Sequence, residues 1–465
     1  MKPAFDLSLY AKRRDRLMEL VQSPILLMGN GNRVSNLPSS ILPFRQDSSF
    51  LYFTGCPLSE AWALLENGRF TLFLEGPHEG DVLWHGPEPS LEELGERYGA
   101  DAVLPPSDLD NMVEKCSPKV LAIGDEGRNR RIADLMGKQL VFGVEHGDAG
   151  LVNAVIKLRR RKGPEELAEM RLAARHTQAA FVTVMKATHL GGHERNLNAL
   201  FNAVLATRQC TTGFDTILTQ RGEILHNMDH CHTLASGRLL LVDGGGECPS
   251  GYTADVSRTW PVNGVFSQRQ QAAYEAVLAA QLAAIEMCHV GVEYRQVHDK
   301  ASATIAQFLH DEGLLTISPE AAVEAGAHAL FFPHGVGHFL GLDVHDLENF
   351  GDLPAYPPQC PRPAQFGTCY LRLNLPLEAN WVVTIEPGFY VVPAILSDPV
   401  LHERFKGMVD FDKAAEWAGF GGIRIEDDIH ITDDGPQVLT QGIPKQIPDL
   451  ESLIGTEPFP DLLCH

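Results

Sequence analysis

The chain has 465 residues, and 60 acidic against 38 basic side chains give it a formal net charge of −22. This balance excludes nucleic acid and anionic membrane surfaces as expected partners, because proteins bind both through basic side chains. Hydrophobic residues make up 44% and charged residues 21% of the sequence, which is typical of a globular protein with large buried cores. The length predicts two or three domains.

No secretion signal or membrane span is indicated by the sequence. The chain begins with charge within its first six residues, and no later stretch approaches the ~20 apolar residues of a membrane helix. The nine cysteines form no Cys-x-x-Cys pair, which favours buried, reduced thiols over a disulfide framework or a thiolate zinc site. We therefore expect a cytoplasmic protein with no membrane partner.

The first third of the chain mixes short helical and strand-like patterns. Residues 11–22 predict a basic amphipathic helix, and residues 24–28, 70–74 and 120–123 form apolar, strand-like runs separated by Gly and Pro. We interpret residues 1–157 as a small α/β domain.

A basic segment followed by Pro164 marks the start of a second domain. Proline at a first helical position, with Glu165 and Glu166 in the first turn, predicts the beginning of a helix. Helical and strand patterns then follow without strict βαβ order, which predicts an α+β domain over residues 158–465. The further predicted helices are 194–208 and 268–287, the predicted strands are 239–243, 252–260, 381–386 and 423–431, and residues 354–363 form a proline-rich loop.

Two aspartates flank a predicted hairpin turn. Asp243 and Asp255 each lie six positions from Pro249, so they are expected opposite one another to within one residue of register. Opposed carboxylates repel, and a cation between them would relieve the repulsion. A lone aspartate in a Gly-rich segment more often caps a turn. Asp243, however, ends a run of four apolar residues, where an unpaired carboxylate is costly.

Two glutamates occupy comparable positions on later strands. Glu386 ends an apolar strand, and Glu426 follows Arg424 on a strand that alternates apolar and charged residues. The alternative for Glu426 is a solvated strand face with an internal Arg–Glu pair. Four carboxylates at strand ends nevertheless favour a common site.

Three histidines lie among glycines between the two acid pairs: His334, His338 and His345. Gly335 and Gly337 argue against a helix, so the four-residue spacing is not that of a helical metalloprotease motif. Each histidine alone could be a satisfied core residue, but the cluster favours a site. Four carboxylates and one imidazole suit Mn²⁺, Co²⁺ or Zn²⁺, and two such ions would activate a bridging water for hydrolysis.

The ordered acids and histidine resemble the metal ligands of the M24 pita-bread metallopeptidases; they are Asp243, Asp255, His338, Glu386 and Glu426. The resemblance is closest to aminopeptidase P (Xaa-Pro aminopeptidase) and prolidase (Xaa-Pro dipeptidase), and residues 44–55 resemble the N-terminal domain of such enzymes. It implies an α+β, pita-bread (creatinase/aminopeptidase) catalytic domain preceded by a smaller α/β domain. It also implies a hydrolase that cleaves the bond between an N-terminal residue and a following proline. This hydrolase would use two divalent ions, and Mn²⁺ is the ion expected first.

By this resemblance, Asp243 ligates one ion, His338 and Glu386 the other, and Asp255 and Glu426 bridge the two. Glu386 is also the implied proton shuttle.

The resemblance implies roles for further residues around the ions. His226, His345 and His334 would be catalytic, the first two holding the substrate and stabilising the tetrahedral intermediate. Arg424 would orient Glu426 and its neighbours. Arg372 falls where prolidases place an arginine for the substrate carboxylate.

Differences from the family pattern leave the substrate length open. One extra residue lies between Asp243 and Asp255, where we expect a bulge within the glycines. Residues 390–421 resemble prolidase, whereas residues 44–55 resemble aminopeptidase P. Xaa-Pro dipeptidase is therefore the alternative activity, and a non-catalytic peptide-binding module is a remote one. Related enzymes are commonly dimers or tetramers, which implies a homo-oligomer.

Overall fold

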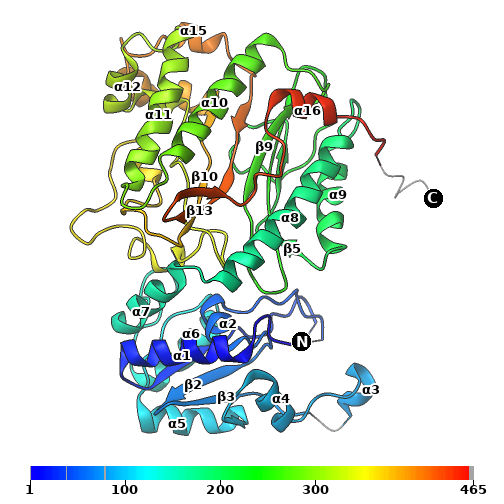
Figure 1. The fold of residues 1–465 in the computed structure, drawn as a ribbon, viewed down its shortest axis with the longest axis vertical. Helices are drawn as coiled ribbons and strands as arrows, with labels where there is room; N and C mark the ends of the chain where they lie inside the picture. The colour runs from blue at the N-terminus through cyan, green and yellow to red at the C-terminus, as the bar shows by residue number, and fades with distance from the viewer. Residues whose placement is uncertain (1, 38, 78–79, 460–465) are drawn as a thin grey trace. The chain divides into compact units, whose positions relative to one another are not determined.

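The structure is a computed structural model that describes residues 2–37, 39–77 and 80–459. The chain divides into two units. The first consists of the residues up to Arg160 together with Leu347–Pro354, and the second of Arg161–Asp346 together with the residues from Ala355 onward. Figure 1 labels many of the helices and strands of both.

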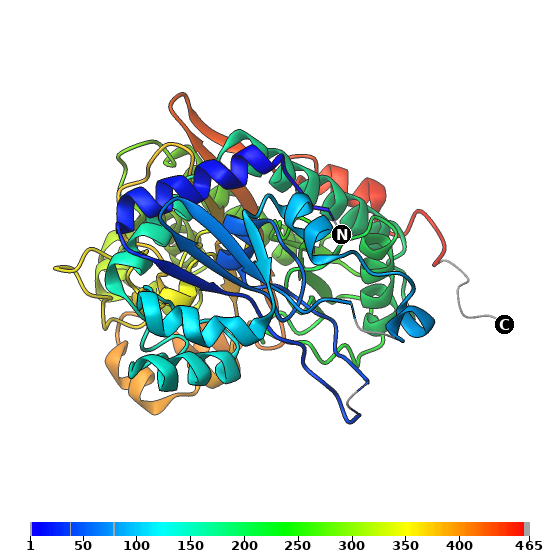
Figure 2. The ribbon, with the colours of Figure 1, turned by 90° about the horizontal axis from the view of Figure 1, so that it is seen from below.

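A four-stranded sheet in the order β1-β2-β3-β4 is the centre of the first unit. Strands β3 and β4 pair in parallel, and the other neighbours are antiparallel. Strands β1 to β3 are apolar and largely buried because helices cover both faces; Figure 2 shows the strands between the dark-blue α1 and the cyan helices. The strands are β1 (Ile25–Met28), β2 (Trp62–Glu66), β3 (Arg69–Phe73) and β4 (Ala102–Leu104), and the helices are α1 (Leu7–Val21), α2 (Ser48–Thr54), α3 (Asp81–His85), α4 (Leu91–Tyr98), α5 (Leu109–Cys116), α6 (Glu126–Met136) and α7 (Ala149–Arg160).

The sequence patterns located one helix and two strands of this unit. The helix predicted at residues 11–22 is α1, the apolar run at 24–28 contains β1, and the run at 70–74 is β3. The strand expected at residues 120–123 is wrong, because this segment forms only isolated bridges to its neighbours. Its apolar side chains are nevertheless buried.

The second unit combines long helices with several small antiparallel sheets. The sheet orders are β6-β7-β9, β10-β13-β14, β11-β12 and β5-β8. Among the described residues of either unit, no helix has both the length and the apolar character needed to cross a bilayer. The strands are β5 (Thr211–Thr212), β6 (Ile217–Thr219), β7 (Leu239–Gly244), β8 (Gly246–Glu247), β9 (Val256–Pro261), β10 (Val382–Ile385), β11 (Gly388–Tyr390), β12 (Gly422–Arg424), β13 (Asp427–Thr432) and β14 (Gly435–Val438), and the helices are α8 (Pro164–Lys186), α9 (Glu194–Ala206), α10 (Gln268–Glu286), α11 (Tyr294–Asp311), α12 (Pro319–Ala325), α13 (Pro393–Leu396), α14 (Pro399–Arg404), α15 (Phe411–Ala415) and α16 (Ile447–Leu453).

Helices α8, α9 and α10 confirm the three helices predicted for this unit. Pro164 occupies the first turn of α8, where its missing N–H costs no helical hydrogen bond, and the Gly163 N–H donates to the Glu166 side chain at 2.8 Å. At α10, Ser267 and Gln270 form a reciprocal capping box. Capping groups that are visible in the sequence thus fix where both helices begin.

The hairpin that carries the two aspartates differs from its predicted register. Asp243 lies opposite Ser257, two residues beyond Asp255, so the expected pairing to within one residue is wrong. The physical reason is a break at Gly245, after which β8 pairs with β5 in another sheet. A Cβ atom at Gly245 would lie 1.7 Å from the Ala254 carbonyl oxygen, so only glycine fits at this break.

Two other predicted strands are shorter than expected. The strand predicted at residues 252–260 begins only at Val256, and the one predicted at residues 423–431 is interrupted between Arg424 and Asp427. The interruption leaves Glu426 between β12 and β13, which belong to different sheets.

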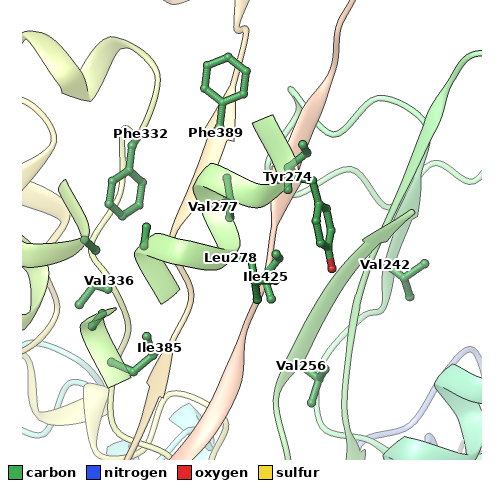
Figure 3. Close-up of a cluster of buried hydrophobic side chains, with 14 of the residues drawn as sticks. Val242, Val256, Tyr274, Val277, Leu278, Phe332, Val336, Ile385, Phe389 and Ile425 are labelled. Atoms are coloured by element: carbon green, nitrogen blue, oxygen red, sulfur yellow. The ribbon is translucent and has the colours of Figure 1, made fainter. Parts of the chain in front are cut away.

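Each candidate acid lies next to an apolar residue that packs into the core. These apolar neighbours are completely buried, and Figure 3 shows them in one cluster with Val277 and Leu278 of α10; they are Val242, Val256, Ile385 and Ile425. Successive side chains of an extended chain point to opposite sides. Burial of the apolar neighbours in this core therefore turns the acids toward a common polar side.

Candidate metal centre

The five predicted ligands form one cluster on this polar side. One ligand atom each of Asp255, His338 and Glu426 lies within 4.8 Å of the other two. The Nε2 atom of His338 is 3.4 Å from Asp255 Oδ2 and 3.7 Å from Glu386 Oε1. Asp243 adjoins them, since its negative charge is one of the causes that raise the pKa of Asp255.

His338 is oriented so that one ring nitrogen faces the carboxylates. Its Nδ1 lies 2.9 Å from the Phe339 carbonyl oxygen, which can only accept, so Nδ1 carries the proton and donates. Its backbone N–H donates to Thr384 Oγ1 at 3.2 Å. Nε2 is therefore left with a lone pair directed at the acids, as a metal ligand requires.

The acids are buried without enough positive charge to balance them. Asp243, Asp255 and Glu426 are between 2% and 8% exposed. The Oδ1 atoms of Asp243 and of Asp255 are buried and accept no hydrogen bond from any donor among the described residues. Such oxygens are costly unless a cation coordinates them, and carboxylate oxygens with one imidazole suit divalent ions. The residues present therefore fit the divalent metal ions that the sequence predicts.

The pKa values of the acids reflect the same excess of buried negative charge. Burial first, and then the charge of Asp243, raises the pKa of Asp255 to about 8. Burial raises the pKa of Glu386 to about 7, although His338 and Arg424 oppose the shift. Burial and the neighbouring acids raise the pKa of Glu426 well above its ordinary value. Bound cations would reverse these shifts by stabilising the ionised carboxylates.

Arg424 connects the cluster to its surroundings. Its Nη2 donates to Asp243 Oδ2, its Nε donates to Ser257 Oγ at 2.8 Å, and its Nη1 donates to Tyr390 Oη at 3.0 Å. Ser257 in turn donates its hydroxyl hydrogen to Glu426 Oε2 at 3.1 Å. Arg424 thus contacts Asp243 directly and reaches Glu426 through Ser257.

Two further acids follow Glu426 and face opposite sides of strand β13. Asp428 accepts a hydrogen bond from the Asp255 N–H, which holds the backbone of that ligand in place. Asp427 pairs with Arg258 at 2.8 Å and with Lys445 at 2.6 Å, and these two charges hold its pKa down at about 2 despite burial. The ion pairs of Asp427 with Arg258 and Lys445 anchor β13, and Asp427 does not enter the metal cluster.

The histidines implied as pocket residues surround the cluster. The ring of His345 is exposed, with its centre 4.2 Å from that of His338. His334 Nδ1 lies 3.8 Å from Glu386 Oε2, and its Nε2 lies 2.9 Å from Tyr390 Oη. Burial and the charge of Arg424 lower the pKa of His334 to about 3, so its ring is neutral.

His226 and Arg372 lie on the same side of the cluster. His226 is exposed. Burial of part of its ring and the charge of Arg424 lower its pKa. The charge of Arg372 also lowers this pKa, whereas the charge of Asp243 raises it. Arg372 is half-buried, and its charge also contributes to the lowered pKa of His334. The structure therefore brings every predicted site residue into one neighbourhood.

Sequence reasoning missed three side chains that support this neighbourhood. Tyr390 joins Arg424 to His334, and Ser257 joins Arg424 to Glu426. Lys162 forms a buried ion pair at 2.8 Å with Asp346, the residue after His345. Ser257 could have been found, because it lies between Asp255 and Arg258 in a segment already singled out. Tyr390 and Lys162 carry no local signal that predicts their contacts.

Comparisons with known proteins support the same assignment. Residues 168–433 match the model of metallopeptidase family M24, and residues 10–120 match the aminopeptidase P N-terminal domain. A probable Xaa-Pro aminopeptidase of Ajellomyces capsulatus is 31% identical over 446 residues, 92% of each chain, and one of Paracoccidioides lutzii is 32% identical over 466 residues, 96% of each chain.

Solved structures of similar proteins have the same fold over their full length. Aminopeptidase PepP of Pseudomonas aeruginosa superposes with a TM-score of 0.80 at 27% identity, covering 97% of this chain and 98% of the other. Zinc-substituted Escherichia coli aminopeptidase P in complex with product gives 0.79 at 26% identity with the same coverage. These matches confirm the predicted pita-bread catalytic domain and the smaller domain that precedes it. The chain therefore belongs to metallopeptidase family M24 and carries the aminopeptidase P N-terminal domain.

Proposed function

We propose that this protein is a Xaa-Pro aminopeptidase that hydrolyses the bond between an N-terminal residue and a following proline. One observation carries the proposal: Asp255, which has a buried oxygen without a hydrogen-bond donor among the described residues, lies in a single cluster with His338 Nε2 and Glu426. Relatives that match nearly the whole chain are named Xaa-Pro aminopeptidases, and this supports the choice of substrate. The expected substrates are peptides with proline at the second position.

The cluster would hold two divalent ions. Asp243 would ligate one ion, His338 and Glu386 the other, and Asp255 and Glu426 both. When bound, the ions would polarise the scissile carbonyl and lower the pKa of water to near neutrality. The many carboxylate oxygens favour Mn²⁺ first, with Co²⁺ and Zn²⁺ as the alternatives.

Glu386 is suited to move a proton during hydrolysis. Its carboxyl group is more exposed than that of Asp255 and lies between His338 and His334, at 3.7 and 3.8 Å. It would take a proton from the attacking water and deliver it to the proline nitrogen as the C–N bond breaks. His334 is neutral, donates from Nδ1 to the Gly335 carbonyl oxygen and is hydrogen-bonded to Tyr390 through Nε2, so it would line the pocket beside the carboxyl group without competing for the proton.

The exposed histidines would position the peptide. His345 and His226 lie on the open side of the cluster, where an imidazole N–H can donate to the substrate carbonyl oxygen as negative charge develops on it. Lys162 supports this arrangement, because its buried pair with Asp346 fixes the loop of His345.

Xaa-Pro dipeptidase is the second candidate, and the position of Arg372 favours it. A guanidinium group near His226 and His334 could bind the carboxylate of a dipeptide in bidentate geometry. A cytoplasmic location and a homo-oligomeric state, dimer or tetramer, stay predictions.

The test is an assay of the Mn²⁺-loaded protein on Xaa-Pro-Yaa peptides and on Xaa-Pro dipeptides. We expect release of the first residue from the longer peptides, loss of this release in Asp255→Asn, and full activity in the exposed control Asp433→Asn. Cleavage of dipeptides alone would move the assignment to the dipeptidase. No cleavage of either substrate by protein with bound ions would refute both activities and leave a peptide-binding module.

A further inference from the structure

A second group of metal-binding side chains lies in the catalytic unit, separate from the cluster of Asp255, His338 and Glu426. It consists of His176 on α8 and of two cysteines, Cys210 and Cys248. One ligand atom of each lies within 4.8 Å of the other two, and the two sulfur atoms are 3.7 Å apart. Cys210 is 4% and Cys248 is 2% exposed, whereas His176 is half-buried and gives access from solvent.

Strand pairing and helix packing bring these residues together. Thr211 of β5 pairs with Glu247 of β8 in antiparallel register, so Cys210 and Cys248 are the next opposed residues. Figure 1 shows α8 beside α9 and β5. Thr177, the residue after His176, accepts a hydrogen bond at 2.9 Å from the Gly246 N–H of β8 and fixes α8 against that strand.

The sulfur–sulfur distance suits two thiolates on one ion. Zinc–sulfur bonds of about 2.3 Å at a tetrahedral angle place two sulfurs about 3.8 Å apart. A disulfide would require about 2.05 Å. The 3.7 Å between Cys210 and Cys248 is close to the first value.

Two of the three protonation states also suit a metal site, whereas the hydrogen bond to Cys210 and burial raise the pKa of Cys248 and keep it a thiol in the metal-free chain. A hydrogen bond from the Cys248 thiol, assisted by the charge of Arg208, lowers the pKa of Cys210 and favours its thiolate. Burial and the same arginine lower the pKa of His176, so its ring is neutral and a nitrogen lone pair is available. Glu169, two turns before His176 on the same helix, raises the pKa of all three groups, because it adds negative charge beside them that a cation would balance.

We propose that His176, Cys210 and Cys248 bind one zinc-class divalent ion, with water or Glu169 in the fourth position. This ion is distinct from the ions of the hydrolytic centre and joins α8 to the β5-β8 sheet. A thiolate site was not expected from the sequence, because the two cysteines are far apart in the chain and form no Cys-x-x-Cys motif. The pairing of β5 with β8 brings the two cysteines together although they are far apart in the chain.

Cobalt substitution tests this proposal with a signal that the hydrolytic centre cannot give. Co²⁺ bound to thiolates shows sulfur-to-metal charge-transfer absorption in the near ultraviolet, whereas carboxylate and imidazole ligands do not. We expect this absorption when Co²⁺ is added to the metal-free full-length chain, with saturation at one thiolate-bound ion per chain. Asp255→Asn should leave the absorption unchanged, so that failure of the hydrolytic proposal is separable from failure of this one.

Variants identify the ligands. Cys210→Ser and Cys248→Ser should abolish the absorption, and Cys231→Ser, which removes an exposed cysteine, should retain it. His176→Gln should lower the Co²⁺ affinity at least about tenfold, and because His176 is half-buried this variant keeps the test valid if a serine variant does not fold. Absence of the absorption in chain with reduced thiols, its persistence in both serine variants, or a Cys210–Cys248 disulfide in the purified protein would overturn the proposal.

Discussion

At the residue scale, Arg424 joins three parts of the metal centre through one guanidinium group. It donates to Asp243, Ser257 and Tyr390 from three different nitrogen atoms. It is also a positive charge buried beside the acids, and its charge limits the rise in pKa of Glu386. A lysine ammonium has the charge but lacks the planar set of donors needed to hold three partners at once.

Replacement of Arg424 by lysine should therefore weaken ion binding more than loss of a single hydrogen bond does. For Arg424→Lys we expect Mn²⁺ affinity to fall about 10–100-fold, with a parallel fall in kcat/KM, because Asp243 and Ser257 lose their orientation. Tyr390→Phe is the matched control, since it removes one hydrogen-bond partner of Arg424 and leaves the ion pair between Arg424 and Asp243. Isothermal titration of metal-free protein measures both, and an Mn²⁺ affinity of Arg424→Lys within twofold of the natural chain would contradict the role.

The site depends on where strands β7, β10 and β12 end and on where β9 begins. The sequence could predict strands at these places and the ends that carry Asp243 and Glu386, because apolar runs and strand alternation are local properties. It could not predict that β9 begins only after Asp255 or that β12 ends before Glu426. It could also predict where α8 and α10 begin from their capping residues. It could not predict that Asp243 pairs with Ser257, since this register depends on β8 leaving the sheet to pair with β5. The partners Tyr390 and Lys162 were missed for the same reason: their contacts are made across the fold and not along the chain.

The break at Gly245 should be sensitive to a single methyl group. A Cβ atom there would collide with the Ala254 carbonyl, and the backbone would have to move next to Asp255. We expect Gly245→Ala to destabilise the fold by about 1–3 kcal/mol and to weaken Mn²⁺ binding. Urea unfolding and metal titration measure these effects. Gly150→Ala is the control, since Gly150 is helical and has open space around it, and equal stability of the two variants would argue against a required glycine.

The formal net charge of −22 includes the charges of a small group of acids that are buried together. The acidic balance excluded nucleic acid and anionic membrane surfaces as expected partners but could not locate this group; its position at strand ends did. In the metal-free chain these acids repel one another and resist ionisation. Two bound divalent ions would balance four of the carboxylates.

The stability of the metal-free chain should therefore fall as the pH rises. Unfolded carboxyl groups titrate near pH 4, whereas in the fold the pKa is about 8 for Asp255 and about 7 for Glu386. Between about pH 4 and pH 8 the folded chain binds more protons than the unfolded chain. The free energy of unfolding therefore falls as the pH rises through this range. Calorimetry should give a lower Tm at about pH 8 than at about pH 5 for the metal-free chain, and Mn²⁺ should raise the Tm most at the higher pH. A metal-free Tm that increases from pH 5 to pH 8 would contradict the electrostatic account.

We propose that buried strand-end acids hold two ions that make this chain an exopeptidase. The most direct measurement is the rate of release of the first residue from a Xaa-Pro-Yaa peptide while Mn²⁺ is added stepwise to metal-free protein. Mn²⁺ prefers carboxylate oxygens to thiolates, so this titration reports the hydrolytic centre. We expect no release without ions and a rate that rises until two Mn²⁺ ions are bound per chain. Release at full rate without ions, or no release with both ions bound, would contradict this proposal.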